Sequence, residues 1–365
     1  MKKTLIPLLF LFSVNIAQAQ NYNLIIGTYT NKGNSEGIYV YDYNTITAET
    51  KLKSTTKTIN PSYLAISKDK KFIYSVNEDG KNSTISSFSF NSQSGNLSFL
   101  DKKDSEGADP CFITTNGNQI LVANYSGGSL ATFYTDIQGK FLKPKQVLQH
   151  TGKSIDTKRQ LSAHVHQVQV TPDKKYLIAT DLGEDQIYIY KIAKTHAREL
   201  TLKSVIKTTP GSGPRHLAFT PNGKFAYLAH EFTGTITTFS YAKGDLHKLQ
   251  EINTVAKDFD GKIDGADIHV TPDGKFLYET NRGDSNSISL FAIATDGTLT
   301  FIETVSTLGK GPRNFSIDPS GDFLLVAHQY TNDVVIFKRD KTTGKLIDSG
   351  IRISVGTPVC LLFSK

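Results

Sequence analysis

A unit of about fifty residues repeats along this 365-residue chain. In its clearest copies, an alternating run leads through a Thr-Pro-Asp-Gly-like turn into a more continuous apolar run (166–181, 215–231, 267–281 and 313–328). Weaker copies cover residues 62–77 and 111–124. The equivalent turn residues are separated by 47, 57, 49, 51 and 47 positions (Asp69, Asn116, Asp173, Asn222, Asp273 and Ser320). Repeats of this length are typical of propeller blades, which bury their faces against their neighbours.

Each unit is predicted to contain four short strands. The alternating run gives the first strand, and the turn that follows it supplies Gly or Asn where positive φ is needed. The second strand, such as 224–229, is apolar on both faces and is therefore expected to be buried. Third strands are expected at 83–90, 128–134, 186–190, 235–240, 287–292 and 333–337, and short polar fourth strands at 97–100 and 299–303.

The chain ends complete the count of blades. Six units are complete, while residues 23–28 and 37–43 resemble second and third strands that lack a first. Residues 357–363 resemble a first strand without successors, so joining the two fragments makes a seventh blade and leaves no open sheet edge. We therefore predict an all-β fold, a seven-bladed β-propeller with four antiparallel strands per blade. Its ring is closed by pairing the N- and C-terminal strands, and residues 20–365 form one domain.

The first nineteen residues are predicted to be a signal peptide. Lys2 and Lys3 precede an apolar run over residues 6–14, and Ala17-Gln18-Ala19 provides a small-x-small cleavage site. No later apolar stretch approaches the ~20 residues that a membrane-spanning helix needs. We expect a periplasmic or secreted protein, free of the membrane after cleavage before Gln20.

The distribution of charge narrows the kinds of partner that we expect. The net charge is +7, but the lysines are dispersed among turns instead of forming a basic stripe, so nucleic-acid binding is not expected. A small anionic molecule is the partner that this balance of charge favours.

The repeat phasing puts Cys111 and Cys360 in non-adjacent blades, where we expect them to be buried separately. We expect the mature protein to be a monomer.

Blade geometry predicts where polar side chains converge. The innermost strand of each blade starts, and the second strand ends, at the same mouth of the central channel. The polar residues at the starts are His164, His166, Arg215, His216, Asp267, Arg313 and Asn314. Those at the ends are Asn77, Asn124, Asp181, His230, Glu231, Asn281, Arg282 and His328. A concave mouth lined by such groups is a candidate small-molecule site.

These groups suit the ring opening of a lactone. An imidazole or a carboxylate can take a proton from attacking water, and guanidinium groups can hold an anion and stabilise a developing oxyanion. No metal-spaced cluster stands out, and no cofactor is expected: the chain lacks the tryptophan that usually stacks on a quinone. A Ser-His-Asp triad is not favoured, because the Gly-x-Ser-x-Gly sequence at residues 33–37 lies between two expected strands and not in the strand-to-helix turn of a nucleophile elbow. Insertions are expected at 146–163 and 251–266; the second contains Asp258, Asp260 and Asp264, interpreted as a polar turn because the glutamate of a calcium loop is absent.

Seven motifs, spread over five of the repeat units, together resemble a known family. They are Val122-Ala-Asn-Tyr-Ser-Gly-Gly128, His164-Val-His166, Gly213-Pro-Arg-His-Leu-Ala-Phe219, Ala229-His-Glu231, Asp267-Ile-His-Val-Thr-Pro-Asp-Gly274, Thr280-Asn-Arg-Gly283 and Gly311-Pro-Arg-Asn314. In this order they resemble the seven-bladed propeller lactonases. That family includes bacterial propeller-type 6-phosphogluconolactonases and is similar to fungal carboxymuconate-lactonising enzymes. The resemblance extends over essentially the whole mature chain.

The resemblance implies a catalytic set of His166, Arg215, Glu231 and Arg282. Glu231 or His166 would be the general base, while the two arginines would hold an anionic lactone and polarise its carbonyl. Position alone adds the candidate substrate-binding residues Asn124, His164, Arg313 and His328. The expected activity is the metal-independent opening of a sugar-acid lactone such as 6-phosphogluconolactone. The reverse lactonisation stays open, as does a propeller that binds a ligand or a protein without catalysis.

Overall fold

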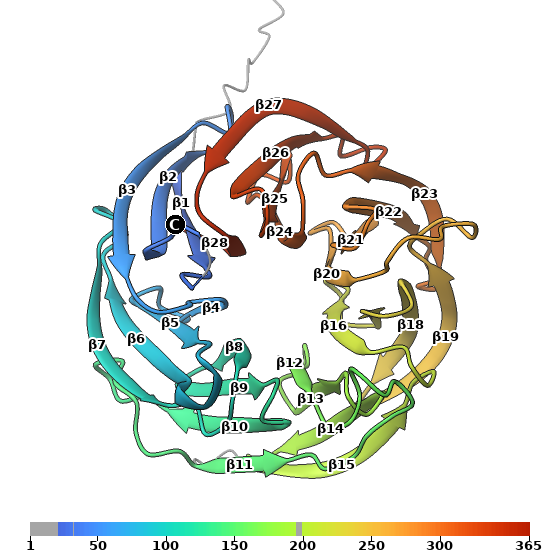
Figure 1. Cartoon of the computed structure of the whole chain (residues 1–365), viewed down its shortest axis with the longest axis horizontal. Helices are drawn as coiled ribbons and strands as arrows, with labels where there is room; N and C mark the ends of the chain where they lie inside the picture. Colours follow the sequence, from blue (N-terminus) through green and yellow to red (C-terminus); the bar gives the residue numbers. More distant parts are fainter. Residues whose placement is uncertain (1–20, 32, 195–198) are drawn as a thin grey trace, which may run out of the picture.

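The protein is a ring of seven four-stranded antiparallel sheets around a central channel (Figure 1). The computed structural model describes residues 21–31, 33–194 and 199–365, so the predicted signal peptide, residues 1–19, lies outside the described residues. The blade that holds both chain ends is formed by β28 (Pro358–Ser364), β1 (Asn21–Thr28), β2 (Gly37–Asn44) and β3 (Thr50–Lys57).

The other six blades each use four consecutive strands, the first of which lies innermost. The next two blades are β4 (Leu64–Ile66), β5 (Phe72–Asn77), β6 (Thr84–Phe90) and β7 (Leu97–Asp104), then β8 (Pro110–Asn116), β9 (Gln119–Asn124), β10 (Ser129–Tyr134) and β11 (Gln146–Gln149). They are followed by β12 (Val165–Val170), β13 (Tyr176–Asp181), β14 (Gln186–Ile192) and β15 (Leu200–Lys207), then β16 (Pro214–Phe219), β17 (Phe225–His230), β18 (Thr235–Ala242) and β19 (Asp245–Asn253). The last two are β20 (Gly265–Val270), β21 (Phe276–Asn281), β22 (Ser287–Ile293) and β23 (Leu299–Ser306), then β24 (Pro312–Ile317), β25 (Phe323–His328), β26 (Asp333–Arg339) and β27 (Leu346–Ser354).

The ring is closed as the sequence predicts. The C-terminal strand β28 pairs antiparallel with β1, placing Leu24 opposite Phe363 and Ile25 opposite Leu362. Figure 1 shows β28 at the channel beside β1, with the C-terminus in the same blade. The last strand therefore supplies the missing inner strand of the first blade, and its pairing with β1 closes the ring.

The hydrophobic core is divided among the blade interfaces. There are seven apolar clusters in the described chain, and each joins side chains of two neighbouring blades. Second strands contribute most completely: every residue of β9 and β25 is buried, as expected for a strand covered on both faces. Cys111 and Cys360 are buried without a disulfide, which confirms that prediction.

The outer strands differ from the prediction in length. β7 runs to Asp104 and β23 to Ser306, several residues beyond the short strands expected, because each extends its pairing along the full third strand. Residues 146–149 are also the outer strand of their blade and not the start of an insertion. The described helical structure is one 3₁₀ turn (Gly80–Asn82), and no helix in the described residues is long and apolar enough to cross a membrane.

The turn after the first strand repeats the same hydrogen bonds in successive blades. Thr220 Oγ1 donates to Asn222 Oδ1 at 2.7 Å and accepts from the Phe225 amide at 3.1 Å. Thr171 and Thr271 make the equivalent bonds with the aspartates of their own turns. The recurring Thr-Pro-Asp or Thr-Pro-Asn sequence is therefore explained by turn formation, and it lies at the strand ends opposite the polar mouth.

Candidate active site

The strand registers bring the polar positions of several blades to one mouth of the channel. In three successive blades the start of the inner strand pairs with the end of the second strand: Val165 with Asp181, Pro214 with His230, and Gly265 with Asn281. The antiparallel geometry therefore puts residues on or next to these positions at the same end of the ring, as the sequence predicts.

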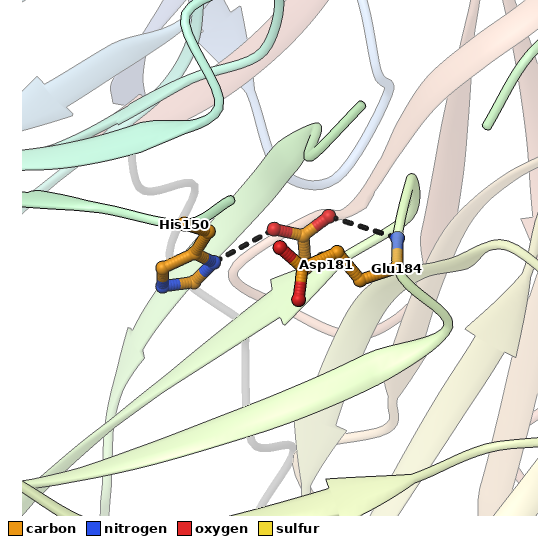
Figure 2. A group of neighbouring side chains, drawn as sticks. All are labelled: His150, Asp181 and Glu184. Atoms are coloured by element: carbon orange, nitrogen blue, oxygen red, sulfur yellow. Dashed lines mark hydrogen bonds and ion pairs between the residues drawn. The ribbon is translucent and has the colours of Figure 1, made fainter. Parts of the chain in front are cut away.

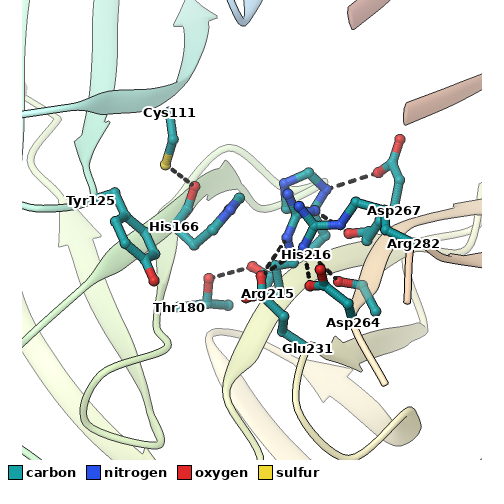
Figure 3. A network of polar contacts seen from close by, with 12 residues as sticks. Cys111, Tyr125, His166, Thr180, Arg215, His216, Glu231, Asp264, Asp267 and Arg282 are labelled. Atoms are coloured by element: carbon teal, nitrogen blue, oxygen red, sulfur yellow. Dashed lines mark hydrogen bonds and ion pairs between the residues drawn. The ribbon is translucent and has the colours of Figure 1, made fainter. Parts of the chain in front are cut away.

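The carboxylate of Glu231, directly after β17, is the centre of the cluster (Figure 3). Its Oε2 accepts hydrogen bonds from Arg215 Nε at 3.0 Å and Arg282 Nη2 at 3.1 Å. Its Oε1 accepts a hydrogen bond from Arg159 Nη2 at 2.6 Å. Arg282 Nη2 also donates to Asp264 Oδ1 at 2.6 Å. Three guanidinium groups thus converge on one buried carboxylate.

The charges of this cluster are fixed by its geometry. Burial on its own would raise the pKa of the Glu231 carboxyl, but Arg282, Arg215 and Arg159 outweigh it and lower that pKa to about 2. Burial, together with Arg282 and Arg313, lowers the pKa of Arg215 to about 10, which still leaves a cation at neutral pH. Glu231 is therefore ionised and saturated with donors. A carboxylate in that state is a weak proton acceptor, and it serves to aim the arginines.

The imidazole of His166, on β12, lies next to this cluster. Its side chain is buried, and its Nδ1 makes no hydrogen bond in the part of the chain that the structure describes. Its ring packs edge-on against Tyr125 and His216, with centroids 5.8 and 5.0 Å away (Figure 3). Burial lowers the pKa of His166 well below 6.5, and the nearby positive charge of Arg215 lowers it further, so the imidazole is neutral.

Two residues that the sequence analysis missed complete the cluster, and both come from the predicted insertions. Arg159 lies between β11 and β12, and Asp264 lies between β19 and β20. Arg159 also packs over the Phe232 ring at 4.7 Å and donates to the Tyr125 hydroxyl at 3.1 Å. The two longer repeat spacings were the available signal, because additional residues between blades have no role in the repeated sheet.

The four positional candidates have different surroundings. Arg313 lies over the Tyr29 ring at 5.4 Å, and its guanidinium makes no ion pair or hydrogen bond within the described residues. His164 stacks on Tyr125 with ring centroids 4.5 Å apart. Asn124 donates to the Ser105 carbonyl oxygen and to Ser129 Oγ, and His328 Nδ1 bonds Asp333. The structure thus brings His166, Arg215, Glu231 and Arg282 together, while Asn124 and His328 hold strand ends and loops.

One described group, His150, Asp181 and Glu184, has the composition of a metal site (Figure 2). Its potential ligand atoms are already engaged: His150 Nδ1 bonds Asp181 at 2.7 Å and Nε2 bonds the Tyr190 hydroxyl at 2.8 Å. Glu184 Oε1 accepts from the Gly152 amide at 2.5 Å, and Oε2 accepts from the Tyr188 hydroxyl. These bonds anchor the start of the loop that carries Arg159, so the group holds a loop in place and does not fit a metal.

The fold and this mouth together define a class: a seven-bladed propeller whose channel opening gathers three guanidinium groups around one carboxylate, beside a neutral imidazole. The family model described as "Lactonase, 7-bladed beta-propeller" matches residues 23–363. The chain belongs to this lactonase family.

Named relatives cover nearly all of the chain. A 6-phosphogluconolactonase of Formosa agariphila is 39% identical over 332 residues, 88% of this chain and 94% of the relative. A 6-phosphogluconolactonase of Bacillus subtilis is 36% identical over 346 residues, 93% of this chain and 97% of the relative. The solved structure of a periplasmic gluconolactonase from Pseudomonas aeruginosa aligns with a TM-score of 0.91 and 35% identity over 95% of this chain and 99% of that one.

Proposed function

We propose that this protein is a lactonase that opens a sugar-acid lactone by hydrolysis at the polar mouth of its channel, without a metal. The observation that carries the proposal is the ionised Glu231, which orients three guanidinium groups beside the neutral imidazole of His166. Lactone hydrolysis needs an anion clamp, an oxyanion stabiliser and a proton acceptor, and the mouth provides all three.

The relatives indicate the substrate class. Two are named for 6-phosphogluconolactone and one for gluconolactone, which share a sugar-acid ring and differ by a phosphate group. Arg313, on the inner strand β24, supports the phosphorylated form, because its guanidinium lies over the Tyr29 ring and makes no ion pair in the described chain. Arginine binds phosphate with two parallel hydrogen bonds when its donors are free. We therefore assign 6-phosphogluconolactone as the substrate to test first.

Arg215 and Arg282 would stabilise the oxyanion. Arg215 gives Nε to Glu231 and Nη1 to the Ala266 carbonyl oxygen, and Arg282 gives Nη2 to Glu231 and Asp264. Arg215 Nη2 and Arg282 Nη1 make no bond in the described residues. As water attacks the acyl carbon, the carbonyl electron pair moves onto oxygen, and these fixed cations stabilise the charge that develops there. Donors positioned in advance for such an oxyanion contribute about 3–4 kcal/mol each in enzymes that have been tested by mutation.

His166 is assigned as the general base in preference to Glu231. The carboxylate accepts three charge-assisted hydrogen bonds and has a pKa near 2, so it has little affinity for a further proton. The imidazole is neutral and has an unoccupied Nδ1. His166 would take the proton of water as the C–O bond forms. It would return that proton to the ring oxygen as the ester bond breaks, leaving the open hydroxy acid.

The proposed compartment is the periplasm or the cell exterior. The proposal rests on the signal-like residues 1–19 and on the Pseudomonas aeruginosa relative, which is described as periplasmic. We propose that the mature chain, residues 20–365, acts there as a monomer on a small anionic lactone and binds no nucleic acid.

The test is acid release from a panel of lactones in a pH-stat with EDTA present. The unaltered protein, Arg215→Ala and Glu231→Ala are compared, with circular dichroism as the check on folding. We expect turnover by the unaltered protein and a loss of about 10²-fold or more in both variants. Equal rates in all three would reject the site, and saturable lactone binding without acid release would indicate a binding propeller instead.

A further inference from the structure

A second buried histidine, His216, packs against His166, and a hydrogen bond to the Asp267 carboxylate fixes its orientation. His216 Nδ1, on β16, is 2.8 Å from Asp267 Oδ1 on β20 of the next blade (Figure 3). Burial would raise the pKa of Asp267, but the two histidines that bond it, His269 and His216, hold that pKa well below its usual range. Because an ionised carboxylate only accepts hydrogen bonds, Nδ1 of His216 carries the proton. Burial, together with the nearby Arg215 cation, lowers the pKa of His216 to about 4, so the imidazole is neutral and its Nε2 presents a lone pair.

That lone pair is buried and has no partner. His216 Nε2 and His166 Nδ1 are both enclosed side-chain atoms that make no hydrogen bond in the described chain. The two rings are 5.0 Å apart between centroids, with an interplanar angle of 68°. A buried acceptor without a partner destabilises the folded protein, so its presence needs an explanation. The buried His150 differs, because both of its ring nitrogens are bonded.

A purely structural role explains only one side of His216. Asp267 joins the inner strands of neighbouring blades: it also accepts hydrogen bonds from His269 Nε2 at 2.9 Å and from Asn314 Nδ2 at 2.5 Å. Asn314 in turn accepts from the Leu361 amide at 2.7 Å. The bond from His216 Nδ1 belongs to this belt around the channel. The free Nε2 contributes nothing to the belt, and the ring that carries it packs edge-on against His166.

We propose that His216 is a positioning residue of the lactonase reaction, which receives at Nε2, directly or across one water molecule, the proton that His166 removes from the attacking water. The inference rests on the proposed function. In the first step the water oxygen bonds the acyl carbon, its O–H bond breaks, and the charge on the imidazole pair is balanced by Asp267. In the second step the ring C–O bond breaks, its electron pair stays on the ring oxygen, and the proton returns to that oxygen along the same route.

Paired substitutions separate this role from the belt. In His216→Asn the amide can still donate to Asp267 where Nδ1 did, but the group that faces His166 is lost. We expect kcat for 6-phosphogluconolactone to fall about 10²-fold, with KM within threefold and the melting temperature within about 2 °C of the unaltered protein. The matched control is His269→Gln, which preserves a donor to the same carboxylate and should leave kcat unchanged.

The outcomes distinguish the two proposals. If the unaltered protein hydrolyses lactones and His216→Asn retains its kcat, His216 is a belt spacer only and the inference is overturned. If the unaltered protein hydrolyses no lactone, the proposed function fails and the inference fails with it. Imidazole ¹⁵N chemical shifts of the unaltered protein give an independent reading that needs no variant. They should show His216 as the neutral Nδ1–H tautomer. An Nε2–H tautomer would contradict the proposal that His216 receives the proton at Nε2.

Discussion

Replacing Glu231 with glutamine should destabilise the protein measurably at neutral pH. The side chain is buried and pairs with Arg215, Arg282 and Arg159. The amide is nearly the same size, so the change removes the negative charge and leaves the buried Arg215 without an ion pair in the described residues, while Arg282 keeps its pair with Asp264. Breaking a buried pair from one side costs about 3–5 kcal/mol. At about 2.1 cal/mol/K per residue, a ring of this length has an unfolding entropy near 0.7 kcal/mol/K, which gives a fall in melting temperature of about 4–7 °C.

The stabilisation that Glu231 provides should depend on pH and decrease on acidification. The arginines lower the folded-state pKa of Glu231 below its ordinary 4.5. The stabilisation is therefore complete above pH 4.5, where the unfolded carboxyl is also ionised, and is lost as the pH falls through the folded-state value. Scanning calorimetry at pH 7 and at steps below 4.5 should show the two melting temperatures converging on acidification.

A surface glutamate provides the control for this experiment. Glu303 pairs with Lys345 at 3.5 Å in a partly exposed position. Glu303→Gln removes the same charge and should shift the melting temperature by less than about 1 °C, because exposed pairs contribute little. An unchanged melting temperature in Glu231→Gln at pH 7 would refute the view that the carboxylate holds the arginines.

Three further predictions concern residues around the site and in the core. Arg159→Gln should raise KM for a phosphorylated lactone about 10-fold, while Lys158→Gln, an exposed neighbour on the same loop, should leave KM unchanged in steady-state assays. Burial raises the pKa of the Cys360 thiol to about 12 and raises that of Cys111 as well, so Ellman's reagent should detect neither thiol in the native protein and both after unfolding. Burial raises the pKa of Glu279 to about 8, so the folded state binds a proton that the unfolded state releases above pH 4.5. Stability should therefore decline between pH 5 and pH 9 in the unaltered protein relative to Glu279→Gln, and parallel denaturation curves at both pH values would contradict this.

The fold was predictable because the same sequence pattern recurs in successive blades. The turn sequence and the apolar second strand recur at a spacing that only a repeat architecture explains, and the incomplete strands at the two ends determine the closure. Strand lengths at the ring's edge were less predictable. The outer strands are polar and exposed, as in β7 and β19, so no apolar pattern marks where their pairing stops.

The site residues that lie at strand ends were predictable, because strand register determines where those ends meet. Arg215, Glu231 and Arg282 lie on or next to paired strand ends, and antiparallel pairing requires such positions to share a mouth. Arg159 and Asp264 could not be found in this way, because loops between blades follow no register. The choice between Glu231 and His166 as base also depended on contacts, since only coordinates show that the carboxylate is saturated and the imidazole is not.

The most direct test of the central claim is a crystal structure of the protein with 6-phosphogluconate, the ring-opened acid. The account predicts that its carboxylate binds at the polar mouth within hydrogen-bonding distance of Arg215 and Arg282, on the side of His166. Binding of the acid at the opposite mouth, where the Thr-Pro-Asp turns lie, or on the outer rim would contradict it.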